Sequence, residues 1–167
     1  MSSNFLWNPG SGNNGLLATA VSLMTTELES LTNGSTVVSS VNGSSGVFNT
    51  SNTAQAMLAL IFFSVGNPSL GGTPSAGGGL LGWFLESLDG GTTFEYSGTT
   101  PSRVADFTIP VPNVSIAAGA APFKTPGPVQ MPALPFKVLL LNNLGQTIGN
   151  GGTTAPWIKF APIAAQY

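Results

Sequence analysis

The stretch Gly79-Leu-Leu-Gly-Trp-Phe-Leu-Glu-Ser-Leu-Asp-Gly-Gly-Thr-Thr-Phe-Glu-Tyr96 holds two apolar runs on either side of Asp89-Gly90-Gly91. An Asp-Gly pair between apolar runs is typical of a β-hairpin, because the centre of the tight turn requires positive φ angles. The sequence therefore predicts a hairpin with arms at Gly82–Leu88 and Thr92–Tyr96.

The first arm of this hairpin is apolar on both of its faces. Side chains alternate between the two faces of a strand, so Leu81, Trp83 and Leu85 lie on one face. Phe84 and Leu88 lie on the other. A strand that is apolar on both faces is typically covered on both sides. We therefore expect it in the centre of a sheet.

Further segments have strand patterns separated by turn signals. A short edge strand is expected within residues 32–52, and the other candidates are Thr53–Val65, Arg103–Val111, Val114–Ile116, Val129–Met131, Phe136–Asn142, Gln146–Ile148 and Pro156–Ile163. Arg103–Val111 alternates between an apolar and a mostly polar face, which indicates a half-buried strand. About eight short strands with turns between them predict an all-β fold, a β-sandwich of jelly-roll-like form.

The segment Leu16–Leu31 fits two structures. An apolar residue recurs every three or four positions, which is the spacing of a helix with one apolar seam; the residues are Leu17, Val21, Met24, Leu28 and Leu31. The alternation of Val21 and Leu23 also fits a strand. The spacing favours one short helix here, with a strand as the alternative.

The chain divides into a flexible N-terminal arm, residues 1–15, and a single β-sandwich domain, residues 16–167. The arm begins with the apolar group Phe5, Leu6 and Trp7, followed by a run rich in Gly and Asn. It is either a solvated tail or a segment that docks on a neighbouring subunit, since a solvated tail gains nothing from a Trp. We therefore name Phe5, Leu6, Trp7 and also Trp157 as interface residues.

No catalytic or metal-binding pattern appears in the sequence. The chain has no Cys and no His, which excludes thiolate nucleophiles, Ser-His triads and the usual zinc ligands. Residues Gly10–Gly15 match the GxGxxG spacing, but no predicted strand precedes them, so we interpret them as a linker. We expect no enzyme activity, no cofactor and no metal.

Two alternative functions depend on a few side chains. Glu86 and Glu95 face each other across the predicted hairpin and could serve as the two carboxylates of a glycoside hydrolase, although solvent-facing strand residues are the commoner role. Trp7, Trp83 and Trp157 could stack on sugar rings in a glycan-binding module. We expect Trp83 in the core.

The scarcity of charge indicates assembly. Charged residues make up 6% of the chain and the formal net charge is -2, whereas about 25% is usual for a soluble domain. So little charge protects a free monomer poorly against self-association, so we expect much of the surface to contact other subunits. The four basic residues are too scattered to bind nucleic acid, and the longest apolar run is shorter than the ~20 residues of a membrane helix. Neither nucleic acid nor a membrane is expected as a partner.

Two stretches carry a family resemblance: Gly-Trp-Phe-Leu-Glu-Ser-Leu-Asp-Gly-Gly-Thr-Thr-Phe at Gly82–Phe94 and Pro-Phe-Lys-Val-Leu-Leu-Leu-Asn-Asn-Leu-Gly at Pro135–Gly145. With them the chain resembles small β-sandwich virion proteins of tailed bacteriophages over Thr53–Ala161. The resemblance implies a capsid decoration (cement) protein or a tail or fibre component, located in the virion and assembled in the host cytoplasm. It implies capsid or other virion proteins as partners and no catalytic residues. A homo-oligomer is expected, with a trimer as the working assumption.

Overall fold

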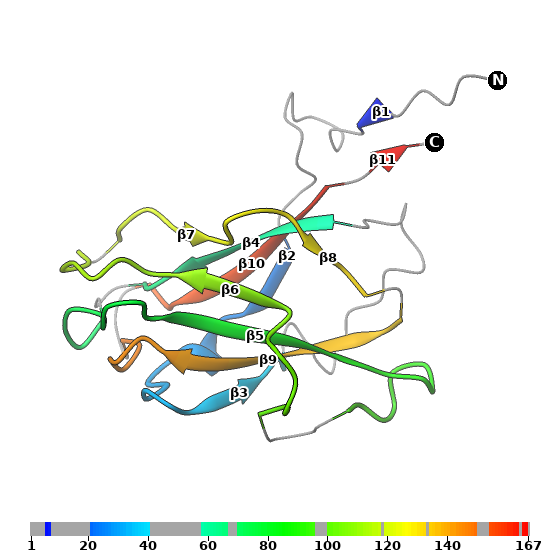
Figure 1. Ribbon diagram of the computed structural model, residues 1–167, viewed down its shortest axis with the longest axis horizontal. Coiled ribbons are helices and arrows are strands. Elements are labelled where there is room, and N and C mark those ends of the chain that lie inside the picture. Colours follow the sequence, from blue (N-terminus) through cyan, green and yellow to red (C-terminus); the bar gives the residue numbers. More distant parts are fainter. Residues whose placement is uncertain are drawn as a thin grey trace.

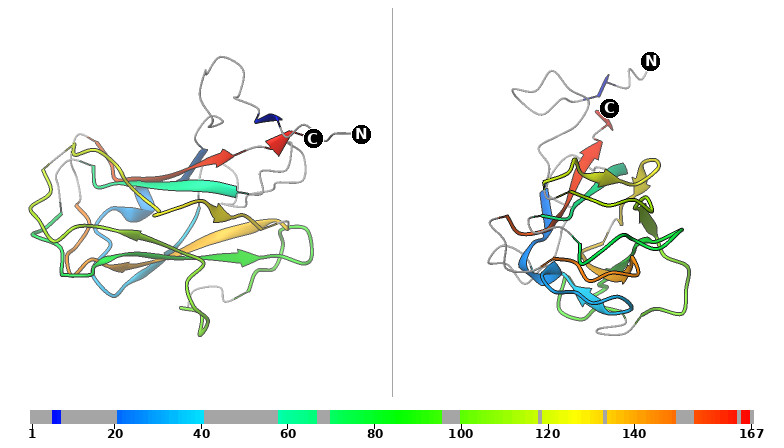
Figure 2. Two further views of the ribbon diagram at one scale, coloured as in Figure 1. Left: turned by 45° about the horizontal axis from the view of Figure 1, so that its top comes forward. Right: turned by 90° about the vertical axis from the view of Figure 1, so that its left-hand side faces the viewer.

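Two antiparallel β-sheets, stacked face to face, form the described part of the chain (Figures 1 and 2). This computed structural model describes residues 6–7, 21–40, 58–66, 70–95, 100–117, 119–132, 134–149, 154–163 and 165–166, of which residues 6, 7, 21, 162, 163, 165 and 166 are described by their backbone alone. The prediction of an all-β sandwich is confirmed.

The two sheets are named here after their central strands. The β4–β10 sheet has the order β2-β10-β4, and two short strands, β7 and β8, pair with the far edge of β4; the bounds are Val21–Met24 (β2), Trp157–Ile163 (β10), Leu58–Ser64 (β4), Phe123–Lys124 (β7) and Val129–Gln130 (β8). The β5–β9 sheet has the order β3-β9-β5-β6, with bounds Thr36–Val38 (β3), Phe136–Asn143 (β9), Gly79–Glu86 (β5) and Phe107–Pro110 (β6). A separate pair joins β1 (Leu6–Trp7) to β11 (Ala165–Gln166), and a single 3-10 turn, η1, spans Thr26–Leu28.

The strand pairing is that of a jelly roll. From the ends of the chain inward, β1 pairs with β11, β2 with β10, β3 with β9, β4 with β8 and β7, and β5 with β6, every pair being antiparallel. The chain is therefore one long hairpin, and the additional pairs β4–β10 and β5–β9 roll it into two sheets. Two interlocked sheets built in this way are the double-sheet jelly roll.

Proline explains why the partner of β4 is split into β7 and β8. The four residues between the two strands are Thr125-Pro-Gly-Pro, and proline has no amide hydrogen to donate to the ladder. Thr125 bridges the gap, because its amide donates to the Ile61 carbonyl (3.0 Å) and its Oγ1 accepts from the Ile61 amide (3.4 Å). Counted as one interrupted strand, β7 and β8 bring the two sheets to the eight strands of the prediction.

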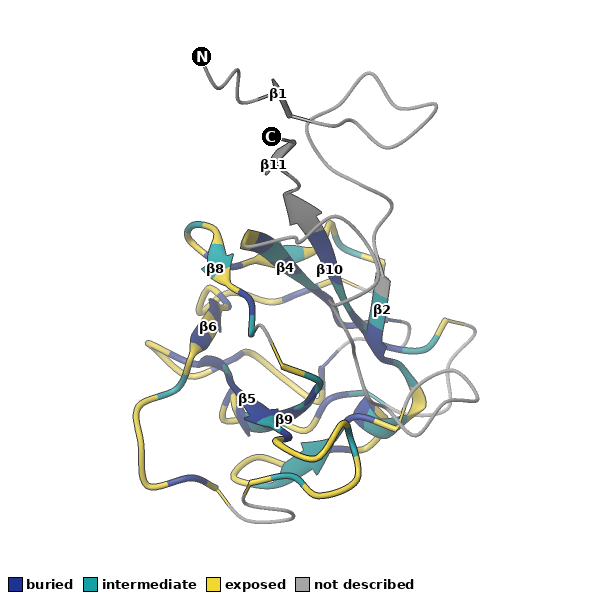
Figure 3. Ribbon diagram, turned by 90° about the vertical axis from the view of Figure 1, so that its right-hand side faces the viewer, coloured by how far each residue is buried: buried dark blue, intermediate teal, exposed yellow. Residues whose placement is uncertain are grey.

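The main core lies between the facing sides of the two sheets, where Figure 3 shows buried stretches of β4, β10, β5 and β9. Phe84 stands at its centre, with the rings of Phe107 and Phe136 at centroid distances of 5.4 and 5.2 Å. Asn142 lies buried at one end of this core. Its Nδ2 donates to the Leu31 carbonyl (2.7 Å) and the Gln146 carbonyl (2.9 Å), so it joins two connections that are distant in sequence.

A second, smaller core covers the opposite face of β5. Trp83, Leu85 and Leu139 are buried there, with Phe94 and Ala105 of the β5–β6 connection packed on them. The prediction that this strand is central and covered on both sides is thereby confirmed. Trp83 is also confirmed as a core residue.

The predicted hairpin is only half correct. The Asp89 turn is present: Oδ1 of Asp89 accepts hydrogen bonds from the Thr92 amide (3.0 Å) and the Thr93 amide (2.8 Å). Of the predicted second arm, Thr92–Tyr96, residues 92–95 form no strand and Tyr96 lies outside the described residues; β5 pairs with β6 and β9 instead. The returning segment crosses the face of the sheet because Phe94 is needed to cover the second core. Leu88, expected on a buried face, is 91% exposed.

The helix predicted for Leu16–Leu31 is wrong within the described residues, which begin at Val21; residues 16–20 lie outside them. Residues 21–24 form β2, followed by η1. A shift in the pairing with β10 falls between Ile158 and Lys159 and leaves Leu23 as an extra residue of β2. Because of this bulge, Leu23 and Met24 are both fully buried although they are neighbours in a strand. The same bulge breaks the alternation that would have marked the strand in the sequence.

The other strand predictions are confirmed with adjusted bounds. Within the predicted ranges lie β3, β4, β8 and β10, and β9 extends its prediction by one residue. Three predictions differ: β6 begins at Phe107 and not at Arg103, and neither 114–116 nor 146–148 is a strand. The short strand β7 was not predicted.

Replacing Gly82 with Ala is expected to lower the free energy of unfolding by about 1–3 kcal/mol, the usual cost of overpacking a core. Gly82 pairs with Phe107 across the β5–β6 ladder, and a Cβ there would overlap the ring of this buried side chain. Urea denaturation followed by circular dichroism measures the change.

Gly127→Ala is the matched control, because a Cβ at Gly127 meets no atom within 4 Å. Its free energy of unfolding should stay within about 0.5 kcal/mol of that of the unchanged protein. Equal stabilities of the two variants would show that the Phe107 ring does not require a glycine beneath it.

Candidate interaction surfaces

Apolar side chains line part of the outer face of the β4–β10 sheet. In β4, Ala59, Ile61 and Phe63 point into the core, so the residues that alternate with them point outward. Those residues are Leu58, 36% exposed, and the half-buried Leu60 and Phe62. The described residues thus leave part of an apolar face uncovered.

Two lysines flank one aromatic residue on this face. Phe62 of β4 is paired with Lys124 of β7 on one side and with Lys159 of β10 on the other. Paired residues of neighbouring antiparallel strands project to the same face. The three residues, named the lysine row below, therefore line up across the outer face of the sheet.

Trp157 adjoins the lysine row on β10. It is half-buried, and Nζ of Lys159 lies 4.6 Å from its ring centroid, a cation–π contact. Of the four interface residues named from the sequence, Trp157 is the one whose side chain the structure describes. Leu6 and Trp7 pair by their backbone with Gln166 and Ala165, and Phe5 lies outside the described residues.

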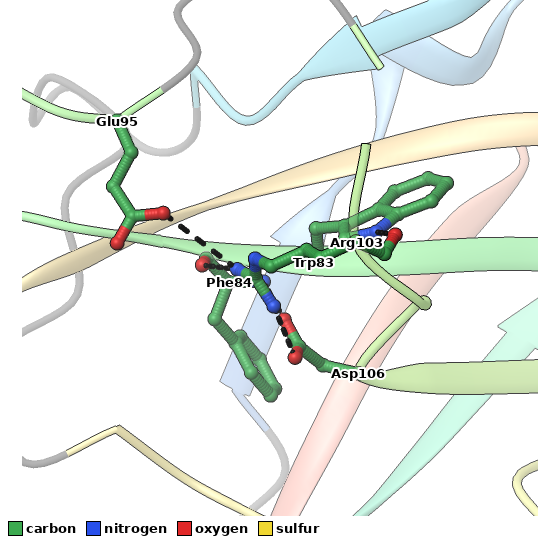
Figure 4. A network of polar contacts seen from close by, with 5 residues as sticks. All are labelled: Trp83, Phe84, Glu95, Arg103 and Asp106. Atoms are coloured by element: carbon green, nitrogen blue, oxygen red, sulfur yellow. Dashed lines mark hydrogen bonds and ion pairs between the residues drawn. The ribbon is translucent and has the colours of Figure 1, made fainter. Parts of the chain in front are cut away.

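Figure 4 shows a polar network on the edge of β5 in the other sheet, where pairing with β6 stops. The last paired residues are Gly82 and Phe107. Beyond them, Oδ2 of Asp106 accepts a hydrogen bond from the Phe84 amide (2.7 Å), and Nη2 of Arg103 donates to the Phe84 carbonyl (2.7 Å). The two side chains replace the next backbone pair of the ladder.

The same network fixes the β5–β6 connection. Nη1 of Arg103 donates to Oδ1 of Asp106, and Nη2 lies 3.9 Å from Oε2 of Glu95. Nε1 of Trp83 donates to the Arg103 carbonyl (3.1 Å). An unpaired strand edge attracts strands of other chains, so these side chains both hold the connection in place and cover the exposed edge of β5.

A second carboxylate, Asp89, organises the tip of this connection. Besides the two amide hydrogen bonds of its turn, it accepts one from Oγ of Ser87 (2.7 Å). The Ser87 hydrogen bond, followed by the Thr93 amide, holds the pKa of Asp89 below its ordinary value of 3.8. The carboxylate is therefore ionised at neutral pH.

The charged side chains are unevenly distributed along the chain, and Lys137 of β9 lies over the Phe94 ring, with its Nζ 4.9 Å from the ring centroid. All ten charged side chains lie in described segments. Four of the six carboxylates belong to residues 86–106, where Arg103 is the one basic residue; they are Glu86, Asp89, Glu95 and Asp106. The strands of the β4–β10 sheet contain two lysines and no carboxylate.

Glu27 joins η1 to the end of β3. Its Oε1 accepts from the amide of Ser40 (2.9 Å) and from Ser40 Oγ (2.5 Å), and its Oε2 accepts from the Thr25 amide (2.9 Å). Partial burial raises the pKa of Glu27, but the hydrogen bonds from Ser40 and Thr25 together outweigh it and leave the pKa below the ordinary 4.5. Folding therefore favours the ionised carboxylate.

Nothing in the described residues forms a metal site, since no three potential ligands cluster there. The two carboxylates considered for hydrolysis lie close in the backbone, where the Glu95 amide donates to the Glu86 carbonyl (3.3 Å). The Glu95 side chain is turned toward Arg103 and is exposed. Among the described residues no helix has the length and apolar character needed to cross a bilayer.

Comparisons with protein-family models, with curated proteins and with solved structures found no match for this chain. The surfaces themselves therefore carry the functional argument. The interface role of Trp157 stays a prediction, and the lysine row was not predicted because its members come from three separate strands. The Arg103–Asp106 network was not predicted either, because residues 103–106 were assigned to a strand.

Replacing Asp106 with Ala is expected to lower the free energy of unfolding by about 1–3 kcal/mol, because the buried Phe84 amide loses its acceptor and Arg103 loses an ionic partner. Asp106→Asn keeps an oxygen in the position of the acceptor and is expected to lose less. Urea denaturation of both variants makes the comparison. Equal losses would contradict the role assigned to the Phe84 hydrogen bond.

The stability of the protein is expected to fall on acidification below pH 4.5 in part through Glu27. Its pKa is depressed in the folded state, so the unfolded state binds a proton first and the stabilisation present above pH 4.5 is lost as the pH falls through the folded-state value. Glu27→Gln should therefore be less stable than the unchanged protein at pH 7, and the difference should shrink toward pH 2–3, roughly the range below depressed carboxylate pKa values.

Glu29→Gln is the control for this experiment, since it removes the same charge from an exposed side chain two residues away. Its free energy of unfolding at pH 7 should change by no more than about 0.5 kcal/mol. A difference between Glu27→Gln and the unchanged protein that is constant over the whole pH range would contradict the assignment.

Proposed function

We propose that this chain is a structural subunit of a tailed-phage virion, a capsid decoration protein that stabilises the shell through contacts between subunits. Its location is then the virion, assembled in the host cytoplasm. Its partners are capsid or other virion proteins and further copies of itself, as a homo-oligomer. The function is mechanical, and no residue is assigned a catalytic role.

The outer face of the β4–β10 sheet is the observation that carries this proposal. The other sheet covers its outer face with its own β5–β6 connection, through Phe94 and Ala105. On the β4–β10 sheet the described residues leave Leu58, Phe62 and Trp157 partly accessible. Apolar area removed from water contributes about 25 cal/mol per Å², so a partner surface that covers these side chains gains affinity.

The charge content supports permanent association. With 6% charged residues, the chain has few groups that oppose contact with other proteins. A subunit repeated many times on a shell also gains from multivalency, because each contact raises the effective concentration for the next. Weak individual contacts are then sufficient to keep it attached.

The jelly-roll architecture supports the proposal. This architecture is found in viral capsid proteins and also in lectins and cupins, and a fold alone does not identify a function. The sequence resemblance to phage virion proteins covers β4, β5 and β9, the strands at the centre of the roll. Fold and resemblance are both compatible with a virion protein, and together they support the proposal.

A glycan-binding or fibre-associated module is the alternative function. It is favoured by the half-buried Trp157, whose ring lies on an accessible sheet face. Trp83, the other described tryptophan, is 3% exposed and cannot stack on a sugar. A glycan array on which the protein binds sugars, and loses them in Trp157→Ala, would favour this alternative.

Co-sedimentation with phage shells tests the proposed function. Shells assembled without the chain are incubated with the purified protein, and binding and the temperature of shell disruption are measured. Leu58→Asp, which places a charge on the apolar face, is expected to weaken shell binding at least about tenfold, a loss of about 1.4 kcal/mol.

Val114→Asp is the matched control, because it makes the same change at an aliphatic residue that is 54% exposed and lies outside both sheets. It should bind shells as the unchanged protein does. No binding by the unchanged protein would overturn the proposed function, and equal binding by both variants would remove the β4–β10 outer face as its surface.

A further inference from the structure

The outward-pointing residues in the described strands of the β4–β10 sheet include two cations and no carboxylate. Strand pairing places Ser22, Lys159, Phe62 and Lys124 in one line across β2, β10, β4 and β7. The remaining outward positions with described side chains are apolar or neutral: Leu58, Leu60, Ser64, Gln130, Trp157 and Ala161. Although the chain has six carboxylates and four basic groups, the strands of this face therefore carry only positive charge.

Neither lysine of the row has an acidic partner among the described residues, where both ion pairs belong to Arg103. Lys159 is half-buried, and its Nζ lies 4.6 Å from the ring centroid of Trp157. A contact with a neutral ring orients the ammonium group without cancelling its charge. Lys124 is exposed on the short strand β7. The row therefore keeps two positive charges, one held against an indole ring and one exposed.

The two charges flank the apolar part of the face. Neighbouring strands lie about 4.8 Å apart, so the backbones of Lys124 and Lys159 are about 10 Å apart with the half-buried Phe62 between them. Leu58 and Leu60 extend the apolar part along β4. Protein interfaces typically have an apolar centre and a polar rim. This face fits a partner that covers its apolar side chains and places carboxylates beside them.

A second copy placed face to face does not supply those carboxylates. A two-fold contact brings the same surface of both subunits together, so two lysine rows would oppose each other. Like charges across an interface weaken binding. The negative charge must therefore come from a different surface.

We propose that the shell surface contacted by the β4–β10 outer face is acidic, with carboxylates that bind Lys124 and Lys159 on either side of the apolar contact. This inference rests on the proposed function and names the chemistry of the partner at the same face. Carboxylates and ammonium groups form charge-assisted hydrogen bonds. Salt screens charges near the solvent, so binding to the shell weakens as the ionic strength rises.

Co-sedimentation of the full chain with shells, repeated at ionic strengths from about 0.01 M to about 1 M, tests the inference. The affinity of the unchanged protein is expected to fall at least about tenfold over this range. Lys124→Gln removes one charge of the row from an exposed side chain, so it should bind about three- to tenfold more weakly at low ionic strength and respond less to salt. Lys137→Gln is the matched control, because it removes the same charge from β9 in the other sheet, and it should bind as the unchanged protein does.

Poly-L-glutamate gives a second measurement that needs no shell. The formal net charge of the chain is -2, so a polyanion is repelled by the protein as a whole and binds where positive charge is concentrated. Titration at an ionic strength of about 0.01 M should shift the NMR amide signals of Lys124, Phe62 and Lys159 more than that of Lys137. Circular dichroism and thermal unfolding confirm that each variant is folded.

Three results would overturn the inference and leave the proposed function standing: shell binding that does not depend on ionic strength, equal affinities of Lys124→Gln and Lys137→Gln for the shell, or poly-L-glutamate shifts that spare the row. Self-association that Lys124→Gln abolishes, measured by sedimentation velocity, would assign the face to a second copy and overturn it as well. No shell binding by the unchanged protein at any ionic strength would overturn both proposals, so the two failures are distinguishable.

Discussion

Strand β5 is apolar on both faces, and both faces must be covered by the same chain. Phe84 points into the core between the sheets, where Phe107 and Phe136 surround it. Trp83 and Leu85 point the other way and are covered by the β5–β6 connection. That connection can cross the face of the sheet only if it does not continue as a paired strand. The double burial of β5 therefore explains why the predicted second hairpin arm is absent.

Side-chain hydrogen bonds replace the backbone pairing between β5 and β6 beyond Gly82 and Phe107. Arg103 and Asp106 satisfy both backbone groups of Phe84 at the point where β6 has turned away. Unsatisfied buried backbone groups are costly, and an open edge invites other strands. The Arg103–Asp106 ion pair meets both needs, and Arg103 also lies 3.9 Å from the Glu95 carboxylate.

The opposite sheet has no such cover within the described residues. Its outer face keeps apolar side chains and two lysines that lack acidic neighbours. This asymmetry gives the sandwich two different faces, one covered by the β5–β6 connection and one with accessible apolar side chains and two lysines. The proposed shell contact depends on this difference, because it uses the accessible apolar side chains.

The sequence by itself determined those features of the fold that show in the alternation of apolar and polar residues and in the composition. The two apolar faces of β5, the buried face of β6 and the apolar run of β9 mark the all-β sandwich. Tertiary structure alone decided the rest, because strand pairing joins residues distant in sequence. Residues 21–24 form a strand because a bulge against β10 buries both Leu23 and Met24, an outcome that local helical spacing cannot reveal. The lysine row exists only because β7 and β10 both pair with β4, which places Lys124 and Lys159 on either side of Phe62.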